Sequence, residues 1–538
     1  MQLTTESGRG ALLLALIMLG LLTAVAIAVR PMTPIDETRY ISVAWEMWLR
    51  GDFLVPFKNG APYSHKPPLM IWLYQAGWAL FGVNVWWPRL VSPLASAISL
   101  WLTMRVAQRL WPQHAGAGSS AVLILASCLL WTFFSTAAMF DVILALFTLL
   151  GMYGTLLAAD GKARRGMVLL GVSIGLGVLA KGPVILLHTL PAALLAGWWN
   201  PVGQKVRWFG GVLAAILIGA AIALAWAVPA GLAGGDEYRH AIFWGQTADR
   251  MVESFAHRRP VWWYLPLLPV LFMPWFVWPG LWGALRNYVR SGVDRGGRFC
   301  VAWMLPVVVA FSFISGKQPH YLIPVFPAFA LLAGRAIVDR ARERRGLWLP
   351  ALIALLIGVA LLALAQGWMA FPLVAAGSAE APALWPGILL AAIAVAAWLV
   401  GNRVVPSVVL AMLGVAVSAL VQIALFRPLH PAYDVRPIAV AISQVQQAGH
   451  LVAHLGMYHD QYHFAGRLRA PLLEIDGSEE LGRWLTEHPE AYAVVYVDNL
   501  DRLQGIKAVA AQRYLDGAAA LLDARSALLV LARAKTSG

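Results

Sequence analysis

The sequence predicts a polytopic α-helical membrane protein of about thirteen transmembrane helices, followed by a small soluble α/β domain. Of its 538 residues 60% are hydrophobic and only 13% are charged, and the mean hydropathy is +0.68. Apolar runs of about 18 residues or more recur between Ala11 and Gln422, and helices of that length cross the roughly 30 Å hydrocarbon layer. From Arg427 onward the apolar runs shorten to strand length. We therefore expect a membrane domain over residues 1–426 and an α/β domain over residues 427–538.

The first span is expected at Ala11–Val29 as a retained helix, because no small-residue cleavage site precedes Arg30. Two short helices are expected next, at Glu37–Arg50 and Pro68–Phe81, and the aromatic residues of the second are typical of a helix lying at the membrane surface. The later spans are expected at Trp87–Leu110, Ser119–Thr136, Phe140–Ala158, Gly166–Ala180, Gly182–Ala196, Phe209–Val228, Trp262–Trp282, Phe299–Ile314, Tyr321–Val338, Leu347–Ala365, Leu384–Val400 and Val404–Leu425.

Short connectors rich in Lys and Arg set the expected orientation, since such connectors stay in the cytoplasm. These basic residues are Lys162, Arg164, Arg165, Lys205, Arg207, Arg286, Arg290, Arg295, Arg298, Arg340, Arg342, Arg344 and Arg345. With the amino terminus in the cytoplasm, the loops at residues 31–86 and 229–261 and the tail after Phe426 lie outside. The formal net charge of +14 has this explanation, so we expect no nucleic-acid partner.

The loop from Pro31 to Leu69 concentrates acids and bases in a chain that is otherwise poor in charge. Isolated charged residues also occupy the other turns expected on the outer face: Asp141, Lys181, Arg250, His257, Lys317 and His320. Charged side chains close to the bilayer are costly, so they are usually paired or functional. Any one of these residues could instead lie at the membrane interface and extend its charged end to the lipid headgroups. Several cations at headgroup level predict a phosphate site, and a nearby carboxylate could orient or deprotonate an acceptor.

Other chemistry has less support in the sequence. Nucleotide-binding and zinc-protease motifs are missing, and Cys128 and Cys300 lie in apolar runs where packing is the ordinary role. His459 and His463 have a spacing that binds a metal on a helix, but their segment, which follows His454, reads as irregular. We therefore expect no required cofactor and assign no metal ligands, and a divalent metal stays an open alternative.

A family resemblance rests on an ordered set of motifs. The opening loop carries DETRY, EM, GD, P, NG, Y-x-x-KPP and RL in that order, followed by Asp141, Lys181–Gly182, and the stretches Phe243–Pro266 and Ser315–Pro327. This order resembles the bacterial aminoarabinose (lipid A) transferase family. That family is related to the protein O-mannosyltransferases and shares the GT-C membrane glycosyltransferase fold. The chain departs from it at His65, where an acidic residue is common, and at His320, where a small hydroxyl residue is common.

The resemblance implies a transferase that moves a sugar from polyprenyl phosphate to an envelope acceptor on the periplasmic face of the bacterial inner membrane. The acceptor would be a lipid A phosphate, another glycolipid or glycan, or a protein hydroxyl. We expect the transfer to invert the configuration of the anomeric carbon. We also expect the protein to be a monomer surrounded by membrane lipids. The expected catalytic acids are Asp36, Glu37 and Asp141. The expected donor-phosphate ligands are Arg39, Lys66, Lys181, Arg250 and Lys317. The expected substrate contacts are Tyr40, Tyr63, His65, His257, His320 and Tyr321.

Two other classes remain open. A transporter would carry polar groups at mid-span and broken helices in repeated halves, whereas the charges here gather at one face. An oligosaccharyltransferase would be expected to carry a Trp-Trp-Asp motif. The Trp pairs at Trp86, Trp198 and Trp262 are followed instead by Pro, Asn and Tyr.

Overall fold

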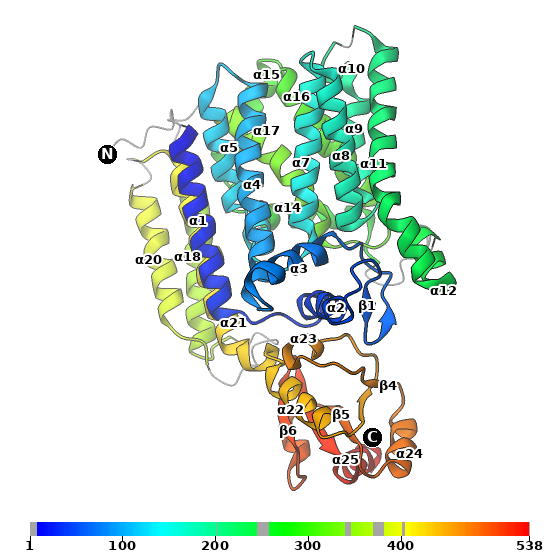
Figure 1. Ribbon diagram of the computed structural model, residues 1–538. Helices are drawn as coiled ribbons and strands as arrows, with labels where there is room; N and C mark the ends of the chain where they lie inside the picture. The colour runs from blue at the N-terminus through cyan, green and yellow to red at the C-terminus, as the bar shows by residue number, and fades with distance from the viewer. Residues whose placement is uncertain are drawn as a thin grey trace.

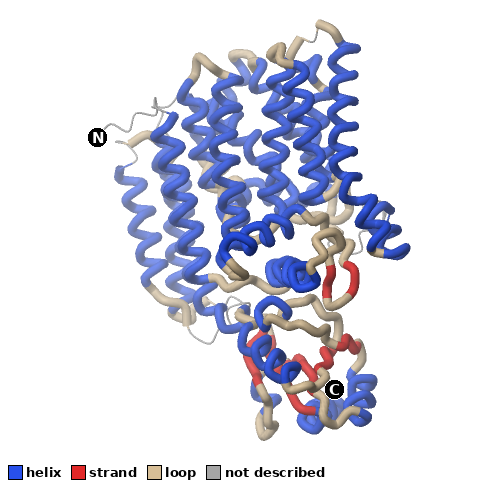
Figure 2. Tube along the Cα trace, viewed as in Figure 1, coloured by secondary structure: helices blue, strands red, loops and turns tan. Residues whose placement is uncertain are grey.

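The computed structural model describes residues 8–201, 203–244, 258–338, 346–369, 381–400 and 404–536. A bundle of long helices forms one end of the molecule and a small α/β domain the other (Figure 1). Short helices and a hairpin of the opening loop lie between them, and the strands are confined to this hairpin and to the C-terminal domain (Figure 2).

Within the described residues, nine helical segments are long and apolar enough to cross a membrane. They comprise α1 (Gly8–Val29), α4 (Trp86–Leu110), α7 (Phe140–Ala159), α8 (Ala163–Lys181), α11 (Lys205–Ala233), α16 (Arg295–Phe313), α17 (Phe326–Val338) with the preceding 3-10 helix η3 (Pro319–Val325), α18 (Trp348–Ala365) and α21 (Pro406–Tyr433). Shorter apolar helices are α3 (Leu69–Phe81), α5 (Ala115–Ser127), α9 (Val184–Leu194) and α20 (Trp385–Val400). The multi-pass helical class is confirmed, and the count of thirteen stays a prediction.

The continuous span expected at Trp262–Trp282 is wrong. This segment consists of the 3-10 helix η2 (Val261–Leu267), the single turn α14 (Leu268–Leu271), further turns, and then α15 (Pro279–Arg290). Prolines 266, 269, 274 and 279 supply the reason, because proline has no backbone N–H and its ring clashes with the preceding helical turn.

Two other expected spans are divided and one is longer. The span expected at Ser119–Thr136 breaks at Cys128 into α5 and α6 (Leu129–Phe134), where the Leu129 N–H donates to the Met273 carbonyl instead of to its own helix. The span expected at Gly182–Ala196 is α9 followed by α10 (Ala196–Trp199). The loop expected from residue 229 begins later, because α11 continues to Ala233 and α12 (Gly235–His240) follows it.

Helices α7 and α8 form an antiparallel pair, so the start of α7 and the end of α8 lie at the same end of the bundle. Their backbones approach closely at Gly154 and Gly166. A Cβ on Gly154 would lie 2.7 Å from the Gly166 carbonyl oxygen, so only glycine permits this distance. From this close approach, near their connector, the two helices run side by side toward the ends that carry the candidate site.

The C-terminal domain contains a five-stranded sheet in the order β4-β3-β5-β7-β6. The strands are β3 (Val452–Leu455), β4 (Leu473–Ile475), β5 (Tyr492–Val497), β6 (Ala510–Tyr514) and β7 (Gly517–Asp523). Strand β3 pairs in parallel with β4 and β5, and β7 pairs antiparallel with β5 and β6. Helix α22 (Arg436–Gln447) covers one face, and α24 (Ser478–Glu487) and α25 (Ala524–Thr536) cover the other. The α/β prediction is confirmed, although α21 continues to Tyr433, beyond the boundary expected at residue 426.

The C-terminal domain is docked on α2 (Asp36–Arg50) and on the hairpin of β1 (Phe57–Lys58) and β2 (Ala61–Pro62). The Ser42 hydroxyl donates to the Asp460 carbonyl at 2.7 Å, and the Trp45 indole donates to the Leu468 carbonyl at 2.9 Å. In the hairpin, the Lys58 ammonium donates to the Tyr458 carbonyl at 2.7 Å. The opening loop is therefore held between the membrane bundle and the C-terminal domain.

Candidate functional site

The centre of the candidate site is a buried ion pair between Asp141 and Lys181. Asp141 lies in the first turn of α7 and its side chain is 1% exposed, whereas Lys181 is the last residue of α8 and its side chain is 13% exposed. The helix dipole favours an anion at the start of a helix, where Asp141 lies, and a cation at the end of a helix, where Lys181 lies. The antiparallel pairing of α7 and α8 therefore brings together two charges that are forty residues apart in the chain.

Aromatic rings connect this ion pair to the other expected residues. The Phe140 ring packs edge-on against Tyr40 at 4.7 Å between centroids, and the Lys66 ammonium lies 5.7 Å from the centre of the same ring. On the other side, the Lys181 ammonium lies 5.1 Å from the centre of the Tyr321 ring. Positive groups over aromatic faces are stabilised by the ring quadrupole. Phe140 and Tyr321 thus hold two lysines at the same end of the bundle.

His320 completes this group of side chains. Its ring packs at a right angle to Tyr321, with 4.9 Å between centroids, and also contacts Phe134 at 5.3 Å. The imidazole is one of the charged or polar groups that interact electrostatically with Asp141. The structure therefore brings together Asp141, Lys181, Lys66, His320 and Tyr321.

The start of α2 contributes Asp36, Arg39 and Tyr40. The Asp36 carboxylate is about half exposed. It lies 3.6 Å from the Arg39 guanidinium and accepts a hydrogen bond from the Tyr40 hydroxyl at 3.3 Å. Burial raises the pKa of Tyr40 well above its ordinary value, so this phenol stays protonated and can donate. Asp36 is the accessible carboxylate of the group, whereas Asp141 is buried.

Glu37, which the sequence placed among the expected catalytic acids, does not join this group. Its two oxygens accept hydrogen bonds from the Ala138 N–H at 2.6 Å and the Thr33 N–H at 2.8 Å, and the Arg30 guanidinium lies 3.6 Å away. Burial raises the pKa of Glu37, but Arg30 and the two backbone donors outweigh it and hold the pKa below its ordinary value. Glu37 therefore anchors α2 to the turn before α7.

Other expected residues have different surroundings. Lys317 is buried, and its ammonium donates to the carbonyls of Arg259 at 2.9 Å and Ile314 at 2.5 Å, so two of its donors are used by the backbone. Tyr63 is buried and stacks on the exposed His65 with 5.3 Å between centroids. Arg250 and His257 lie outside the described residues.

The tail histidines do not form the helical pair that a metal would require. Helix α23 (His463–Gly466) begins at His463, so His459 is not on it, and the His454 ring is 2.9 Å from the Tyr496 hydroxyl. His463 instead approaches two buried carboxylates, Glu46 of α2 and Asp460. Burial raises the pKa of both acids and lowers the pKa of His463 to about 4.

Sequence reasoning missed two residues beside the site. Phe140 supports both Tyr40 and Lys66, and its position directly before Asp141 was the available signal. His188 of α9 is fully buried, and within the described residues neither of its ring nitrogens has a hydrogen-bond partner. It interacts electrostatically with Lys181 and Asp141, so it belongs to their surroundings.

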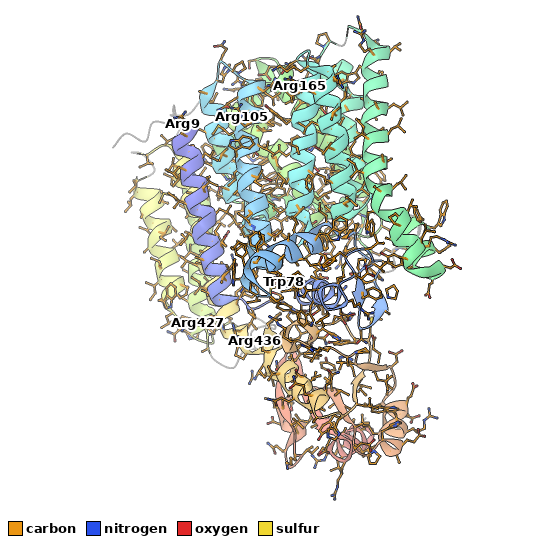
Figure 3. All side chains as sticks on the ribbon, viewed as in Figure 1. Arg9, Trp78, Arg105, Arg165, Arg427 and Arg436 are labelled. Atoms are coloured by element: carbon orange, nitrogen blue, oxygen red, sulfur yellow. The ribbon has the colours of Figure 1, made fainter. Side chains whose placement is uncertain are left out.

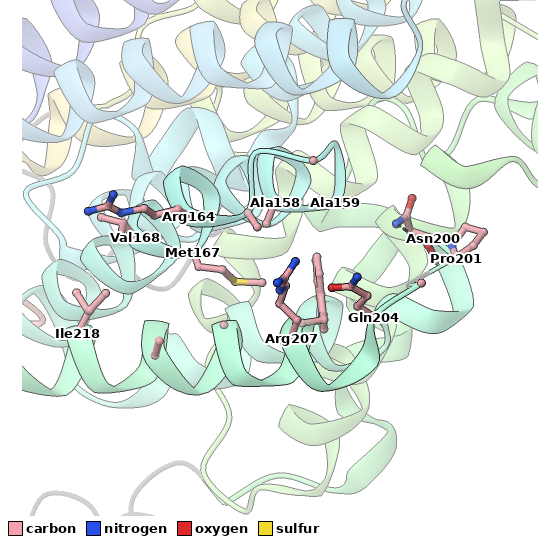
Figure 4. Close-up of a pocket in the computed structure, with 16 residues that line it drawn as sticks. Ala158, Ala159, Arg164, Met167, Val168, Asn200, Pro201, Gln204, Arg207 and Ile218 are labelled. Atoms are coloured by element: carbon pink, nitrogen blue, oxygen red, sulfur yellow. Dashed lines mark hydrogen bonds between the residues drawn. The ribbon is translucent and has the colours of Figure 1, made fainter.

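A separate pocket of about 400 Å³ lies between α8 and α11 (Figure 4). Its lining includes Arg164, Arg207 and Gln204, at the start of α8 and of α11, and none of the expected site residues. Since Lys181 ends α8, the pocket and the ion pair are at opposite ends of that helix.

Comparison with known proteins identifies similar chains. Residues 65–229 match the family model described as dolichyl-phosphate-mannose-protein mannosyltransferase. The undecaprenyl phosphate-alpha-4-amino-4-deoxy-L-arabinose arabinosyl transferase of Pseudomonas paraeruginosa is 33% identical over 336 residues, 61% of this chain and 60% of that protein. The protein of the same name from Erwinia tasmaniensis is 31% identical over 334 residues, 60% of this chain and 59% of its own length. The chain thus matches about three fifths of the length of these curated relatives.

Solved structures extend the likeness to the whole fold. The crystal structure of ArnT from Cupriavidus metallidurans in the apo state has a TM-score of 0.75 at 22% identity, and covers 96% of this chain and 99% of that one. The same protein bound to undecaprenyl phosphate has a TM-score of 0.73 at 21% identity, with coverage of 95% and 97%. The resemblance seen in the motifs is confirmed: this chain is similar in sequence to the aminoarabinose transferases and has the ArnT-like GT-C fold.

Proposed function

We propose that this protein transfers a sugar from a polyprenyl phosphate to an envelope acceptor at the periplasmic face of the bacterial inner membrane. The observation that carries the proposal is the meeting of the Asp141–Lys181 pair, Lys66 and the accessible Asp36 at one end of the membrane bundle. Cations at headgroup level suit a lipid phosphate, because charge-assisted hydrogen bonds to phosphate are strong. The relatives named above, which are undecaprenyl phosphate-dependent transferases, support the same donor class.

In the proposed reaction the acceptor oxygen attacks the anomeric carbon from the side opposite the polyprenyl phosphate, which leaves as the carbon–oxygen bond breaks. The ammonium groups of Lys181 and Lys66 stabilise the negative charge that develops on the leaving phosphate. These groups supply the positive charge themselves, so the proposal requires no metal at the transfer centre. Asp141 holds Lys181 in place before the donor binds.

Asp36 has one of two roles that depend on the acceptor. A hydroxyl acceptor would lose its proton to Asp36, which would then be the general base. A phosphate acceptor needs no base, and Asp36 would then position the acceptor or balance charge together with Arg39. The names of the relatives favour aminoarabinose as the sugar, and a lipid A phosphate is the acceptor that we propose first.

The proposed orientation rests on the distribution of basic residues. Arg9, Arg105 and Arg165 lie at the end of the bundle away from the C-terminal domain (Figure 3). Basic ends of membrane helices remain in the cytoplasm. The ion pair and the C-terminal domain then face the periplasm. All residues of the proposed site come from one chain, so we propose that the monomer is sufficient.

The direct test is a transfer assay on the purified full-length protein in detergent. Undecaprenyl phosphate-linked aminoarabinose and lipid A are supplied together, and mass spectrometry follows the mass increase of lipid A. We expect a product with the native protein and almost none with Lys181→Ala. Modification of a different glycan or of a protein hydroxyl by cells that express the chain would correct the acceptor. An unchanged envelope profile, combined with no transfer in vitro, would contradict the transferase itself.

A further inference from the structure

Three ligand-type side chains meet where the C-terminal domain touches α2. Glu46 comes from α2, whereas Asp460 and His463 come from the C-terminal domain. The candidate ligand atoms of the three all lie within 4.8 Å of one another, and the three residues are 6%, 0% and 2% exposed. The site is therefore enclosed on both sides by protein, at an interface that neither domain could form alone.

The hydrogen bonds around the two acids leave part of their charge uncompensated. Glu46 accepts from the Gly60 N–H at 3.1 and 3.3 Å, and the Arg50 guanidinium is 3.9 Å away. Asp460 accepts one hydrogen bond through Oδ2, from the Asn59 N–H at 3.1 Å. Across the described part of the chain, Oδ1 of Asp460 has no hydrogen-bond partner. A buried carboxylate oxygen without a partner is costly and calls for an explanation.

The His463 ring lies close to this oxygen. Oδ1 of Asp460 lies 3.7 Å from Nδ1, which is too long for a hydrogen bond, and Oε1 of Glu46 lies 3.7 Å from Nε2. Nδ1 is also 2.9 Å from the Tyr458 hydroxyl. This contact orients the imidazole ring and leaves Nε2 available to bind a metal. Metal-bound histidines commonly have such a hydrogen-bond partner on the ring nitrogen that does not bind the metal. The nearby Lys58 ammonium is directed to the Tyr458 carbonyl and not to either carboxylate.

We infer that Glu46, Asp460 and His463 form a binding site for a divalent transition-metal ion that joins the C-terminal domain to α2. One imidazole nitrogen and two carboxylate oxygens are a donor set suited to Zn²⁺. When Zn²⁺ is bound, the two carboxylates together supply two negative charges, which balance the charge of the ion. Ligand atoms about 2.0–2.1 Å from a tetrahedral zinc are about 3.4 Å apart. Of the two 3.7 Å separations, only the one between Oε1 of Glu46 and Nε2 of His463 joins two ligand atoms of such a site, because Nδ1 faces the Tyr458 hydroxyl. The candidate ligand atoms of all three residues lie within 4.8 Å of one another, and side-chain rotation would bring them to the zinc-bound spacing.

The site is structural and separate from the proposed transfer centre. Glu46 follows Asp36 on the same helix by ten residues, which corresponds to about 15 Å along α2. A metal here does not reach the reacting atoms, but it fixes the helix that carries Asp36 and Arg39 against the C-terminal domain. Because the ligands come from two domains, metal binding stabilises their docking and not either domain by itself.

The test uses tag-free full-length protein in detergent, stripped with EDTA and then titrated with Zn²⁺ against a competing fluorescent chelator. We expect one Zn²⁺ per chain for the native protein. Asp460→Asn and His463→Asn should each weaken zinc binding about 100-fold or more, and Glu46→Gln tests the ligand from the membrane domain independently. Glu474→Gln is the matched control, since Glu474 contacts the same interface through Asn59 and Tyr458 but is not one of the three ligands.

Thermal unfolding separates a ligand from an ordinary structural acid. In EDTA, Asp460→Asn should melt at the same temperature as the native protein or higher, because without metal the buried Asp460 side chain has an oxygen with no hydrogen-bond partner in the described part of the chain. In Zn²⁺, the native protein should melt several degrees higher than this variant. Absence of zinc binding by the native protein, native affinity in Asp460→Asn, or an equal loss in Glu474→Gln would overturn the site. So would an Asp460→Asn melting temperature that is lowered equally in both buffers.

Discussion

Asp141 and Lys181 form a buried ion pair between the first turn of α7 and the last residue of α8, at the end of the bundle where α2 and the C-terminal domain lie. The antiparallel packing of α7 on α8 brings the two residues to the same end of the bundle. Lys181 is therefore a cation held beside the membrane, and Asp141 is the acid that pairs with it and orients it.

Replacing Lys181 with alanine should lower sugar transfer by about two orders of magnitude, the effect of losing a charge-assisted contact of about 3 kcal/mol. Asp141→Asn should give a smaller loss, because it removes the partner of Lys181 and not the proposed phosphate contact. The double variant should lose less than the sum of the two, since both changes act on one pair. Transfer rates of purified proteins at matched concentration measure all three.

Lys205→Ala is the control for this series, because Lys205 is exposed at the start of α11, outside the proposed site. Its transfer rate should stay close to that of the native protein. An equal loss in Lys205→Ala and Lys181→Ala would show that general positive charge, and not the ion pair, determines the rate.

Asp36→Asn keeps the shape of the side chain and removes its charge. We expect almost complete loss of transfer with normal amounts of protein in the membrane, because Asp36 is the accessible carboxylate beside Arg39. Product formation measured by mass spectrometry tests this. If the variant is fully active, Asp36 is not at the reaction centre and Asp141 becomes the acid to examine.

The sequence predicted the class of fold and the isolated charges of the site for a simple physical reason. Asp141 and Lys181 stand in apolar surroundings, where a charge is costly unless it is paired or functional, so each was visible without a structure. Their mutual pairing was not visible. It depends on the packing of two helices and on a separation of forty residues in the chain.

The neighbouring acids Asp36 and Glu37 show what local sequence cannot resolve. Adjacent residues of a helix point about 100° apart, so Asp36 faces outward while Glu37 turns toward Arg30 and Ala138. Hydropathy also overstated the span at Trp262–Trp282, where prolines interrupt the helix. The docking of the C-terminal domain on α2 joins residues more than four hundred positions apart, which no local pattern reveals.

Lys66→Ala should also lower transfer by about two orders of magnitude. Lys66 precedes Pro67 and Pro68, which restrict its backbone, and its ammonium lies over the Phe140 ring beside Asp141. Arg290→Ala at the end of α15 is the matched control, because Arg290 is exposed and belongs to a connector assigned to the cytoplasm. A transfer rate close to native in Lys66→Ala would remove this lysine from the phosphate site.

A fusion of alkaline phosphatase after the last residue tests the orientation in a bacterium. Alkaline phosphatase is active only in the periplasm, where its disulfides form, so the fusion should be active. A fusion after Arg165, in the first turn of α8, should be inactive because it keeps the basic residues Lys162, Arg164 and Arg165 at this end of the α7–α8 pair. The reverse pattern would place the ion pair on the cytoplasmic side.

Glu37→Gln should destabilise the folded protein at neutral pH, because it leaves the buried Arg30 without its counter-charge. Breaking such a pair costs roughly 3–5 kcal/mol. The pKa of Glu37 is held below its ordinary value of 4.5 in the folded state, so the unfolded chain binds this proton more readily. Its contribution to stability is therefore complete above about pH 4.5 and is lost as the pH falls through the lower, folded-state pKa.

The difference in melting temperature between the native protein and Glu37→Gln should accordingly be large at pH 7 and shrink as the pH falls below 4.5. Glu480→Gln on the exposed face of α24 provides the control and should melt like the native protein across the range. Other carboxylates titrate in both proteins, so only the difference between them reports on Glu37. A difference that stays constant with pH would mean that the Glu37 charge does not stabilise the fold, and that the change acts through shape alone.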